Sequence, residues 1–189
     1  AHAGQPRIYG LCWEFAAHTD NHFDADLFLR FVRAYQSVQQ LTMAELWALP
    51  VIMRAVLLEH LRRVAVRVVK AQAARQAADD YANELIALAQ KMPENEQPAI
   101  VLPPGRLLQP FVVQLVQRLR YQQPGFTTLL DALGARLVDQ GPTIDDIVLR
   151  EHTTQVASNQ TIRNIITSMR AISAYDWRVF FESCLLYTS

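Results

Sequence analysis

The sequence has few cysteines and no excess of charge. Cys12 and Cys184 are the two cysteines in 189 residues. Isolated cysteines near opposite ends do not make a disulfide framework, so we expect a reducing compartment. The 18 Lys and Arg residues balance the 18 Asp and Glu residues, for a formal net charge of +0. Without a basic excess, we expect no bulk electrostatic attraction to nucleic acid or to an anionic membrane surface.

Long apolar runs are also lacking. Glu45, Arg54 and Glu59 interrupt the most hydrophobic region, which excludes the ~18 uncharged residues that a membrane-spanning helix needs. The opening AHAGQPRIYG has neither the basic start nor the apolar core of a signal peptide, and it contains no initiator Met. We therefore interpret the chain as an excerpt from a longer gene product, with no transmembrane span of its own.

Helical periodicity is what the sequence does contain. Hydrophobic residues make up 51% of the chain, which is enough to bury a sizeable core. Apolar residues recur with a helical period along almost the whole length, and segments that alternate apolar and polar residues are missing. The pattern predicts an all-α fold, a multi-helix bundle.

Prolines indicate how the bundle is divided. The stretch 93–105 holds Pro93, Pro98, Pro103 and Pro104, and we interpret it as an extended Pro-rich connector laid over the surface. It separates an N-terminal helical half, 1–92, from a C-terminal helical half, 106–183.

Capping residues mark several expected helix starts. Asp24 is a good N-cap, Thr42 and Glu45 form a capping box, and Thr143 with Asp146 repeats the N-cap signature. Pro50 is expected to bend its helix, unless the first two turns form a separate short helix. The expected helices cover about 7–17, 24 onward, 42 to about 90, 109–121, 127–138, and 143 onward with a break near 173–176 before a short aromatic helix at 177–181.

Residues 46–69 place an apolar arc of roughly 160° on a helical wheel at about 100° per residue. Arg54 falls in the middle of this arc, where a guanidinium is costly unless a carboxylate or several carbonyls meet it. We expect a partner from another helix, with Glu151 and Glu182 as candidates. The alternative is that Arg54 extends along its methylenes into water. The arc contains Leu46, Trp47, Pro50, Val51, Met53, Leu57, Leu58, Leu61, Val64, Val68 and Val69.

Acidic and imidazole side chains alternate between two expected helices: His18, Asp20, His22, Asp24 and Asp26. Metal ligands sometimes alternate in this way, but the spacing matches neither a zinc site nor a complete EF-hand. We favour a solvated loop whose aspartate caps the next helix, and metal binding is the weaker alternative.

A basic stripe follows later in the chain: Arg62, Arg63, Arg67 and Lys70. It could touch phosphates, yet it has no interleaved aromatic residues, so we favour a solvated face over a nucleic-acid interface. Near the C-terminus, a polar group predicts side chains that are buried between helices and need hydrogen bonds. Its members are Asn159, Asn164, Thr167 and Ser168.

Motifs for catalysis do not occur. The sequence offers no glycine-rich phosphate loop, no Ser-His-Asp or Cys-His arrangement, and no carboxylate pair framed by a strand. We therefore expect no catalytic, cofactor-binding or metal-binding residue in this segment.

Three long stretches have an unusual composition: LTMAELWALPVIMRAVLLEHLRR, LLQPFVVQLVQRLR and NQTIRNIITSMRAISAYDWRVFFES. They resemble the N-terminal region of bacterial cyclic β-1,2-glucan synthases, over about residues 7–183. The resemblance implies a parent enzyme at the bacterial inner membrane, a glucosyltransferase that polymerises glucose from UDP-glucose and closes the chain into a ring. It also implies that the parent uses a divalent metal together with UDP-glucose.

The same resemblance implies a non-catalytic role for this segment. The acidic residues that would hold the metal and the sugar nucleotide belong to a later module, so no catalytic residue is carried over. We expect a helical scaffold or regulatory region on the cytoplasmic side, whose partners are other modules of the same polypeptide. A free-standing helical protein-interaction module is the alternative. The positions carried over as structural signatures are Thr42, Glu45, Trp47, Pro50, Arg54, Arg62, Arg63, Asn164, Met169, Arg170, Asp176 and Trp177.

The ending departs from the family pattern. Residues 184–189, CLLYTS, stand where a helical continuation rich in Val and Asp is expected. They resemble translated adapter sequence, so we interpret this tail as non-native.

Overall fold

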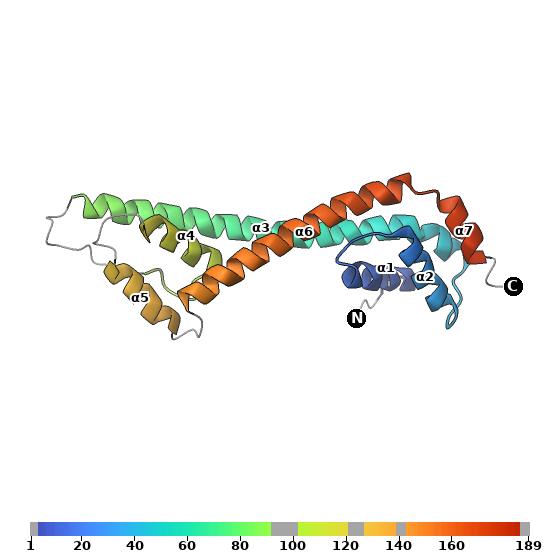
Figure 1. Cartoon of the computed structure of the whole chain (residues 1–189), viewed down its shortest axis with the longest axis horizontal. Coiled ribbons are helices and arrows are strands. Elements are labelled where there is room, and N and C mark those ends of the chain that lie inside the picture. The colour runs from blue at the N-terminus through green and yellow to red at the C-terminus, as the bar shows by residue number, and fades with distance from the viewer. Residues whose placement is uncertain (1–3, 92–101, 121–126, 139–142, 186–189) are drawn as a thin grey trace. The chain divides into compact units, whose positions relative to one another are not determined.

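The fold is all-α, as predicted. The computed structural model describes residues 4–91, 102–120, 127–138 and 143–185, and no strand occurs among them. Figure 1 shows the order of the helices along the chain. The helices are α1 (Arg7–His18), α2 (Ala25–Gln36), α3 (Met43–Ala89), α4 (Gln109–Arg120), α5 (Thr127–Val138), α6 (Ile144–Ala174) and α7 (Trp177–Leu185).

The chain forms two compact units. The first combines Ala1–Ala65 with Ser158–Ser189, and the second is Val66–Ala157. This division differs from the expected halves, 1–92 and 106–183, because α3 and α6 each supply residues to both units. Most of the expected connector, 93–105, lies outside the described residues, as do residues 186–189 of the expected non-native tail. Cys184 of that tail is buried in α7.

The predicted helix caps are present. The Asp24 carboxylate accepts a hydrogen bond from the backbone N–H of Leu27 at 2.7 Å. At the start of α3, the Glu45 N–H donates to Thr42 Oγ1 (3.3 Å) and the Thr42 N–H donates to Glu45 Oε2 (2.8 Å). Each bond satisfies a backbone donor that the first turn of a helix leaves without a partner.

Pro50 lies inside α3, and the helix continues through it as one element. A separate short helix before Pro50, one of the two predicted outcomes, is therefore not observed. Proline has no N–H, so the carbonyl of Leu46 receives no helical hydrogen bond four residues later.

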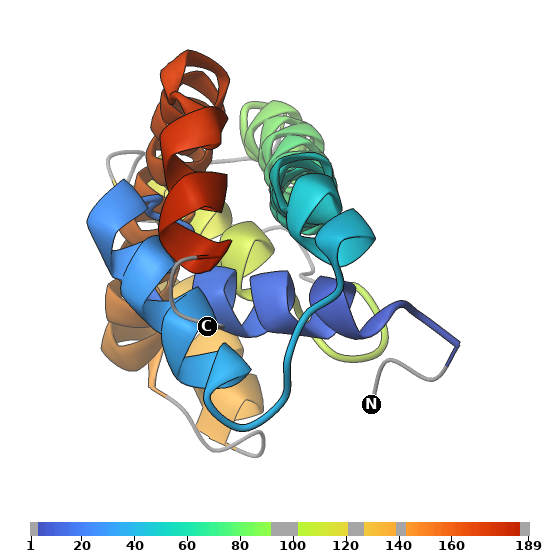
Figure 2. The same ribbon diagram turned by 90° about the vertical axis from the view of Figure 1, so that its right-hand side faces the viewer.

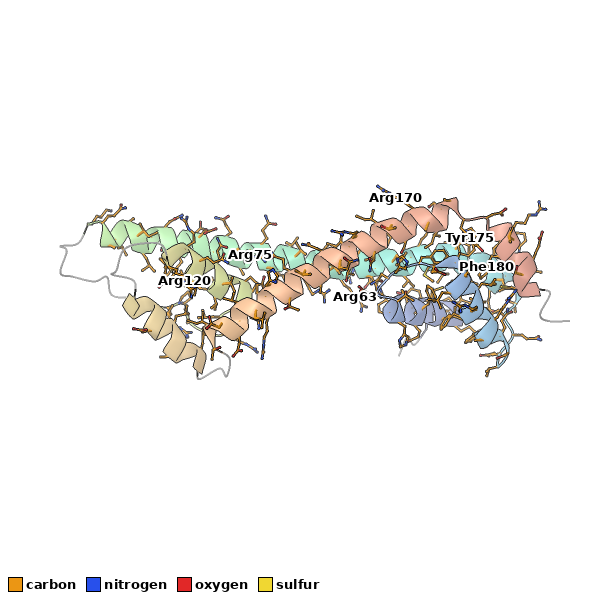
Figure 3. The ribbon with its side chains drawn as sticks, in the orientation of Figure 1. Arg63, Arg75, Arg120, Arg170, Tyr175 and Phe180 are labelled. Atoms are coloured by element: carbon orange, nitrogen blue, oxygen red, sulfur yellow. The ribbon has the colours of Figure 1, made fainter. Side chains whose placement is uncertain are left out.

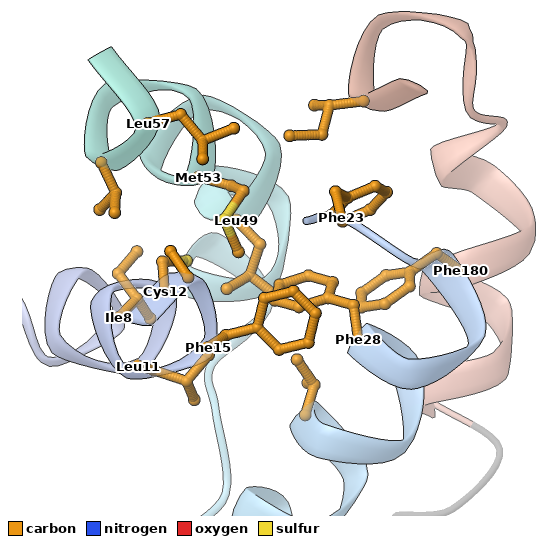
Figure 4. Packing of buried hydrophobic residues seen from close by; sticks show 14 of the residues in the cluster. Ile8, Leu11, Cys12, Phe15, Phe23, Phe28, Leu49, Met53, Leu57 and Phe180 are labelled. Carbon is orange, nitrogen blue, oxygen red and sulfur yellow. The ribbon is translucent and has the colours of Figure 1, made fainter. Parts of the chain in front are cut away.

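The core of the first unit is aromatic. Phe28 and Phe180, both 0% exposed, stack with ring centroids 5.5 Å apart. Phe15 meets Phe28 edge to face at 4.8 Å, and Met53 of α3 lies in the same cluster (Figure 4). The helices α2 and α7 lie side by side in both ribbon views (Figure 1 and Figure 2). Burying one such ring contributes roughly 1.5–3 kcal/mol, so this cluster stabilises the unit substantially.

The core of the second unit joins small residues of α3 to large residues of α4. Ala74, Ala78 and Ala82 recur every four residues and are buried against the apolar face of α4. Their short side chains leave room for the larger side chains of α4. The larger residues in this cluster include Phe111, Val112, Leu115, Leu119, Leu133, Leu137 and Ile147.

The apolar arc predicted on α3 is partly wrong. Leu46, Met53, Leu57 and Val64 are buried as expected. The buried face also takes in Leu49 and Val56, which the arc left out, whereas part of the arc faces solvent. Because apolar residues occur almost all around α3, periodicity alone could not select the buried side. The arc residues that are exposed are Trp47, Val51, Leu58, Val68 and Val69.

Candidate functional site

The loop between α1 and α2 has an unusual backbone. Asp20 and Asn21 are consecutive non-glycine residues with positive φ, 48° and 62°. Asp and Asn tolerate this left-handed region better than other side chains, but holding two in a row requires support from the surroundings. Part of that support is the Asn21 N–H, which donates to the Ala16 carbonyl at 2.7 Å.

Helix α6 supplies further support. Asn164 Nδ2 donates to the Asp20 carbonyl at 2.9 Å. Ser168 Oγ donates to the Asn21 carbonyl at 2.8 Å and accepts from the Phe23 N–H at 2.7 Å. Ser168 is 1% exposed, so these bonds satisfy backbone groups that water does not reach. The loop is thus held by residues about 145 positions later in the chain.

The prediction of buried polar groups on α6 is correct only in part. Ser168 is buried and Asn164 is half-buried, and both hydrogen-bond across helices. Asn159 and Thr167 are exposed, and the Thr167 hydroxyl donates to the Arg163 carbonyl within its own helix. A Ser or Thr hydroxyl can always bond its own helix, so sequence alone did not distinguish the two cases.

Helix α3 closes the site from another side. His60 Nδ1 donates to Asn21 Oδ1, and because a carbonyl oxygen only accepts, this nitrogen carries the proton. The His60 ring meets Trp13 of α1 edge to face, with centroids 4.2 Å apart. The guanidinium carbon of Arg63, labelled in Figure 3, lies 4.5 Å from the centroid of the Trp13 ring. This distance is within the range of a cation–π contact.

The electrostatics of this site favour the neutral form of His60. Burial lowers the pKa of His60 below its ordinary value of 6.5, and the nearby Arg63 lowers it further, while Glu59 acts in the opposite direction. A neutral imidazole beside an amide and an indole has no adjacent nucleophile to activate. The arrangement can therefore fix the α1–α2 loop, but it contains no pair of groups suited to acid–base or nucleophilic catalysis.

The sequence did not point to His60, Asn21 or Trp13. His60 is seven residues after the buried Met53, so it falls on the buried face of α3 once that face is known. Asn21 lies in the polar loop, and the tolerance of Asn for positive φ could have marked it. Neither signal identifies the partner, because the contact joins residues 39 positions apart.

Three of the five alternating acidic and imidazole residues make contacts to other parts of the chain. Asp24 caps α2, and Asp20 Oδ1 accepts from Thr161 at 3.2 Å. His18 lies 3.6 Å from Glu14 one turn earlier. Within residues 4–91, 102–120, 127–138 and 143–185, no group of three or more His, Cys, Asp and Glu side chains is placed to hold a metal ion.

Glu59 binds the start of the basic stripe. It accepts from Arg62 Nε at 2.7 Å and from Arg63 Nε at 2.9 Å. These two hydrogen bonds lower the pKa of Glu59 to about 2. A carboxylate shared by two guanidiniums reduces the positive charge that this face offers to a phosphate.

The expected partners of Arg54 are both wrong. Glu151 accepts from Arg75 Nη2 at 2.6 Å, in the second unit. Glu182 accepts from Arg178 Nε at 3.1 Å, one turn away on α7. Arg54 itself is half-buried, and its Nε atom is buried without a hydrogen-bond partner among the residues that the structure describes.

Several signature residues join helices. Arg7 of α1 donates from Nε and Nη2 to the two Glu45 oxygens, each at 2.6 Å, which lowers the pKa of Glu45 to about 2. Trp177 Nε1 donates to the Ile172 carbonyl at 2.9 Å, and Asp176 caps α7 by accepting from the Arg178 N–H at 3.1 Å.

The remaining signature residues on α6 and the neighbouring turn differ in exposure. Met169 packs against the first core, whereas Arg170 is exposed. Tyr175, which is not a signature residue, lies just after α6 and is labelled with Phe180 in Figure 3; the two rings meet edge to face, with centroids 6.5 Å apart.

The second unit has its own polar contacts and a groove. Asp79 of α3 accepts from Gln114 of α4 at 2.9 Å, and Arg118 Nε lies 3.3 Å from the same carboxylate. A groove of about 510 Å³ is lined mainly by apolar and aromatic side chains, including Tyr81 and Phe111.

None of the helices that the structure describes combines the length and the apolar composition that a membrane crossing requires.

A comparison with known proteins identifies a relative. No protein-family model matches the chain. Cyclic β-(1,2)-glucan synthase NdvB of Rhizobium meliloti (strain 1021) is 33% identical to it over 179 residues. The match covers 94% of this chain and 6% of the relative, so the chain spans a small fraction of the relative's length. The resemblance predicted from the three stretches is confirmed: the chain is related to a segment of the cyclic β-(1,2)-glucan synthase family.

Proposed function

We propose that this chain is a non-catalytic helical scaffold or regulatory region of a larger cyclic β-(1,2)-glucan synthase. One observation carries the proposal: ionisable side chains in the first unit are used to join helices. Glu45 binds Arg7, Asp20 binds Thr161, and His60 binds Asn21. Groups engaged in this way do not converge on a position that a substrate could occupy.

The chemistry is assigned to the rest of the parent polypeptide. The relative is named for making a cyclic β-(1,2)-glucan, and this chain corresponds to 6% of its length. In our proposal the parent polymerises glucose from UDP-glucose at the bacterial inner membrane, with a divalent metal held by another module. The present segment lies on the cytoplasmic side and contacts other modules of the same polypeptide.

The first test uses the purified chain. The chain should neither bind nor turn over UDP-glucose in the presence of Mg²⁺ or Mn²⁺, as measured by calorimetry and by release of UDP. Release of UDP by the chain alone would overturn the non-catalytic assignment.

The second test uses the complete polypeptide. Phe28→Ala removes a ring from the centre of the first unit and should reduce the amount of assembled, glucan-forming enzyme. Val179→Ala, at a 53% exposed position of α7, is the matched control and should leave this amount unchanged. A polypeptide that forms cyclic glucan normally after deletion of the whole segment would contradict the scaffold role.

A free-standing protein-interaction module is the second candidate. The exposed apolar side chains of α3 favour it, because such residues mark interaction surfaces. The reading frame beyond residue 183 in an intact genome separates the two. Several hydrophobic spans and a glycosyltransferase acid motif there would support the synthase region, and a stop codon would support the independent module.

A further inference from the structure

One side of α3 in the first unit is apolar and exposed. Trp47, Val51 and Leu58 are 65%, 64% and 54% exposed. At about 100° per residue they fall within about 40° of one another on the helix. Ala55, one turn after Val51 and about 40° further round the helix, is also exposed. We call Trp47, Val51, Ala55 and Leu58 the α3 outer face.

Trp47 is held in place although it is exposed. Its ring stacks on Phe181 of α7, with centroids 6.0 Å apart and an interplanar angle of 12°. A large ring fixed by a neighbour loses little conformational freedom when a partner covers it. Tryptophan in this situation is the residue type that contributes most to binding at protein interfaces.

Arg54 lies at the edge of the same face. By helical spacing it is 20° from Trp47 and 40° from Leu58 at about 100° per residue. Its Nε is buried and has no hydrogen-bond partner within the described part of the chain. The side chain as a whole is half-buried, so an incoming group meets the guanidinium beside the buried Nε, and a carboxylate is the acceptor that matches its charge and geometry. The α3 outer face therefore combines an apolar surface with a cation that an acidic group of a partner would neutralise.

We propose that an amphipathic helix from another part of the same polypeptide covers the α3 outer face and presents a carboxylate to Arg54. This inference rests on the proposed function, in which the chain is one segment of a longer synthase. The matched relative is long enough to supply such a helix, since the chain corresponds to 6% of it. A tethered helix also binds at a high effective concentration, so a face with few large residues is sufficient.

A second copy of this chain fits the face less well. In a symmetric pair, each outer face meets its own counterpart, so Arg54 would have to find an acceptor on the same surface. Glu59, the nearby carboxylate on α3, already accepts from Arg62 and Arg63. A pair of copies would therefore bring the two Arg54 side chains together while Glu59 is already shared by two other arginines.

The test is site-specific photo-cross-linking in the complete polypeptide. Val51→p-benzoylphenylalanine probes the outer face, and Val38→p-benzoylphenylalanine is the matched control, because Val38 is 90% exposed in the turn after α2. We expect the Val51 variant to cross-link to a peptide of the same polypeptide outside these residues. The yield should exceed that at Val38 by about tenfold or more, since a tethered contact is occupied most of the time.

Two further variants test the chemistry of the contact. Trp47→Ala should lower the Val51 cross-linking yield, and it leaves the buried core intact because Trp47 is 65% exposed. Arg54→Glu should lower the yield as well, and exchanging the facing acid of the cross-linked peptide for Arg should restore it. Restoration shows that the variant is folded and that the two charges meet.

Three outcomes would overturn the inference. They are equal yields at Val51 and Val38, a cross-link within the present chain, and a cross-link between differently labelled copies. Each can occur while the chain remains a non-catalytic part of a longer synthase. Failure of the proposed function is read separately, from UDP release by the chain alone or from a stop codon after residue 183.

Discussion

His60 of α3 donates a hydrogen bond to the side chain of Asn21, whose backbone has a φ of 62°. This contact ties the left-handed turn between α1 and α2 to α3, while Ser168 ties the same turn to α6. One short loop is therefore held by two helices that are far from it in the sequence. Because the backbone conformation of the loop is unfavourable in isolation, the surrounding bonds must maintain it.

We expect the stability of the chain to fall as the pH drops below the ordinary range of histidine titration. Burial lowers the pKa of His60 in the folded state below 6.5, so the unfolded chain takes up this proton first. The full contribution is present above pH 6.5 and declines as the pH falls toward the lowered folded-state pKa.

Urea unfolding at about pH 7.5 and about pH 5.5 measures this effect. His60→Gln, which keeps a side-chain donor but does not titrate, should lose less stability between the two values than the parent chain. An identical loss in both proteins would show that His60 does not contribute to the pH dependence.

Ser168→Ala should destabilise the chain by about 1–3 kcal/mol, the usual cost of buried backbone groups without hydrogen-bond partners. The substitution leaves the Asn21 carbonyl and the Phe23 N–H without their side-chain partner. Ser173→Ala is the control, since Ser173 is exposed and its hydroxyl donates to the Met169 carbonyl of its own helix. Equal unfolding midpoints for the two variants in urea would argue against a special role for Ser168.

Thr42→Ala should destabilise the chain by about 1 kcal/mol, because it removes the hydroxyl that accepts from the Glu45 N–H at the start of α3. Thr42→Ser keeps the hydroxyl and should retain most of the stability. Urea unfolding followed by far-UV circular dichroism compares the two. If serine is as damaging as alanine, the methyl group of Thr42 rather than its hydroxyl is responsible.

Phe28→Ala should cost about 3–5 kcal/mol, the usual range for removing a buried aromatic ring. Phe28 is 0% exposed, and the centroid of its ring lies 6.3 Å from that of the Trp177 ring. Unfolding can therefore be followed by tryptophan fluorescence. Phe28→Leu should cost clearly less, because it leaves a smaller cavity. A cost below that of Val179→Ala, at an exposed position, would show that Phe28 is not central to this core.

Local features of the fold could be predicted from the sequence, and long-range ones could not. The caps at Asp24, Thr42 and Thr143 were predictable because each bond joins residues three positions apart. The buried side of α3 could not be predicted, because Leu46 and Trp47 are adjacent apolar residues. Tertiary packing alone decides that Leu46 is buried and Trp47 is exposed. The prediction of an acceptor for Arg54 was wrong for the same reason, because Glu151 bonds Arg75 and Glu182 bonds Arg178.

The contact between α3 and α4 gives a last prediction, for the second unit. Ala78 is 0% exposed and belongs to the stripe of small residues that α4 covers. Ala78→Leu should destabilise the chain by about 1–3 kcal/mol, because the added atoms force the two helices apart. Ala73→Leu, at an exposed position of the same helix, should have little effect, since leucine has nearly the helix propensity of alanine. Both variants can be compared by urea unfolding and circular dichroism. If Ala78→Leu proves as stable as Ala73→Leu, then α4 does not pack on this stripe in solution.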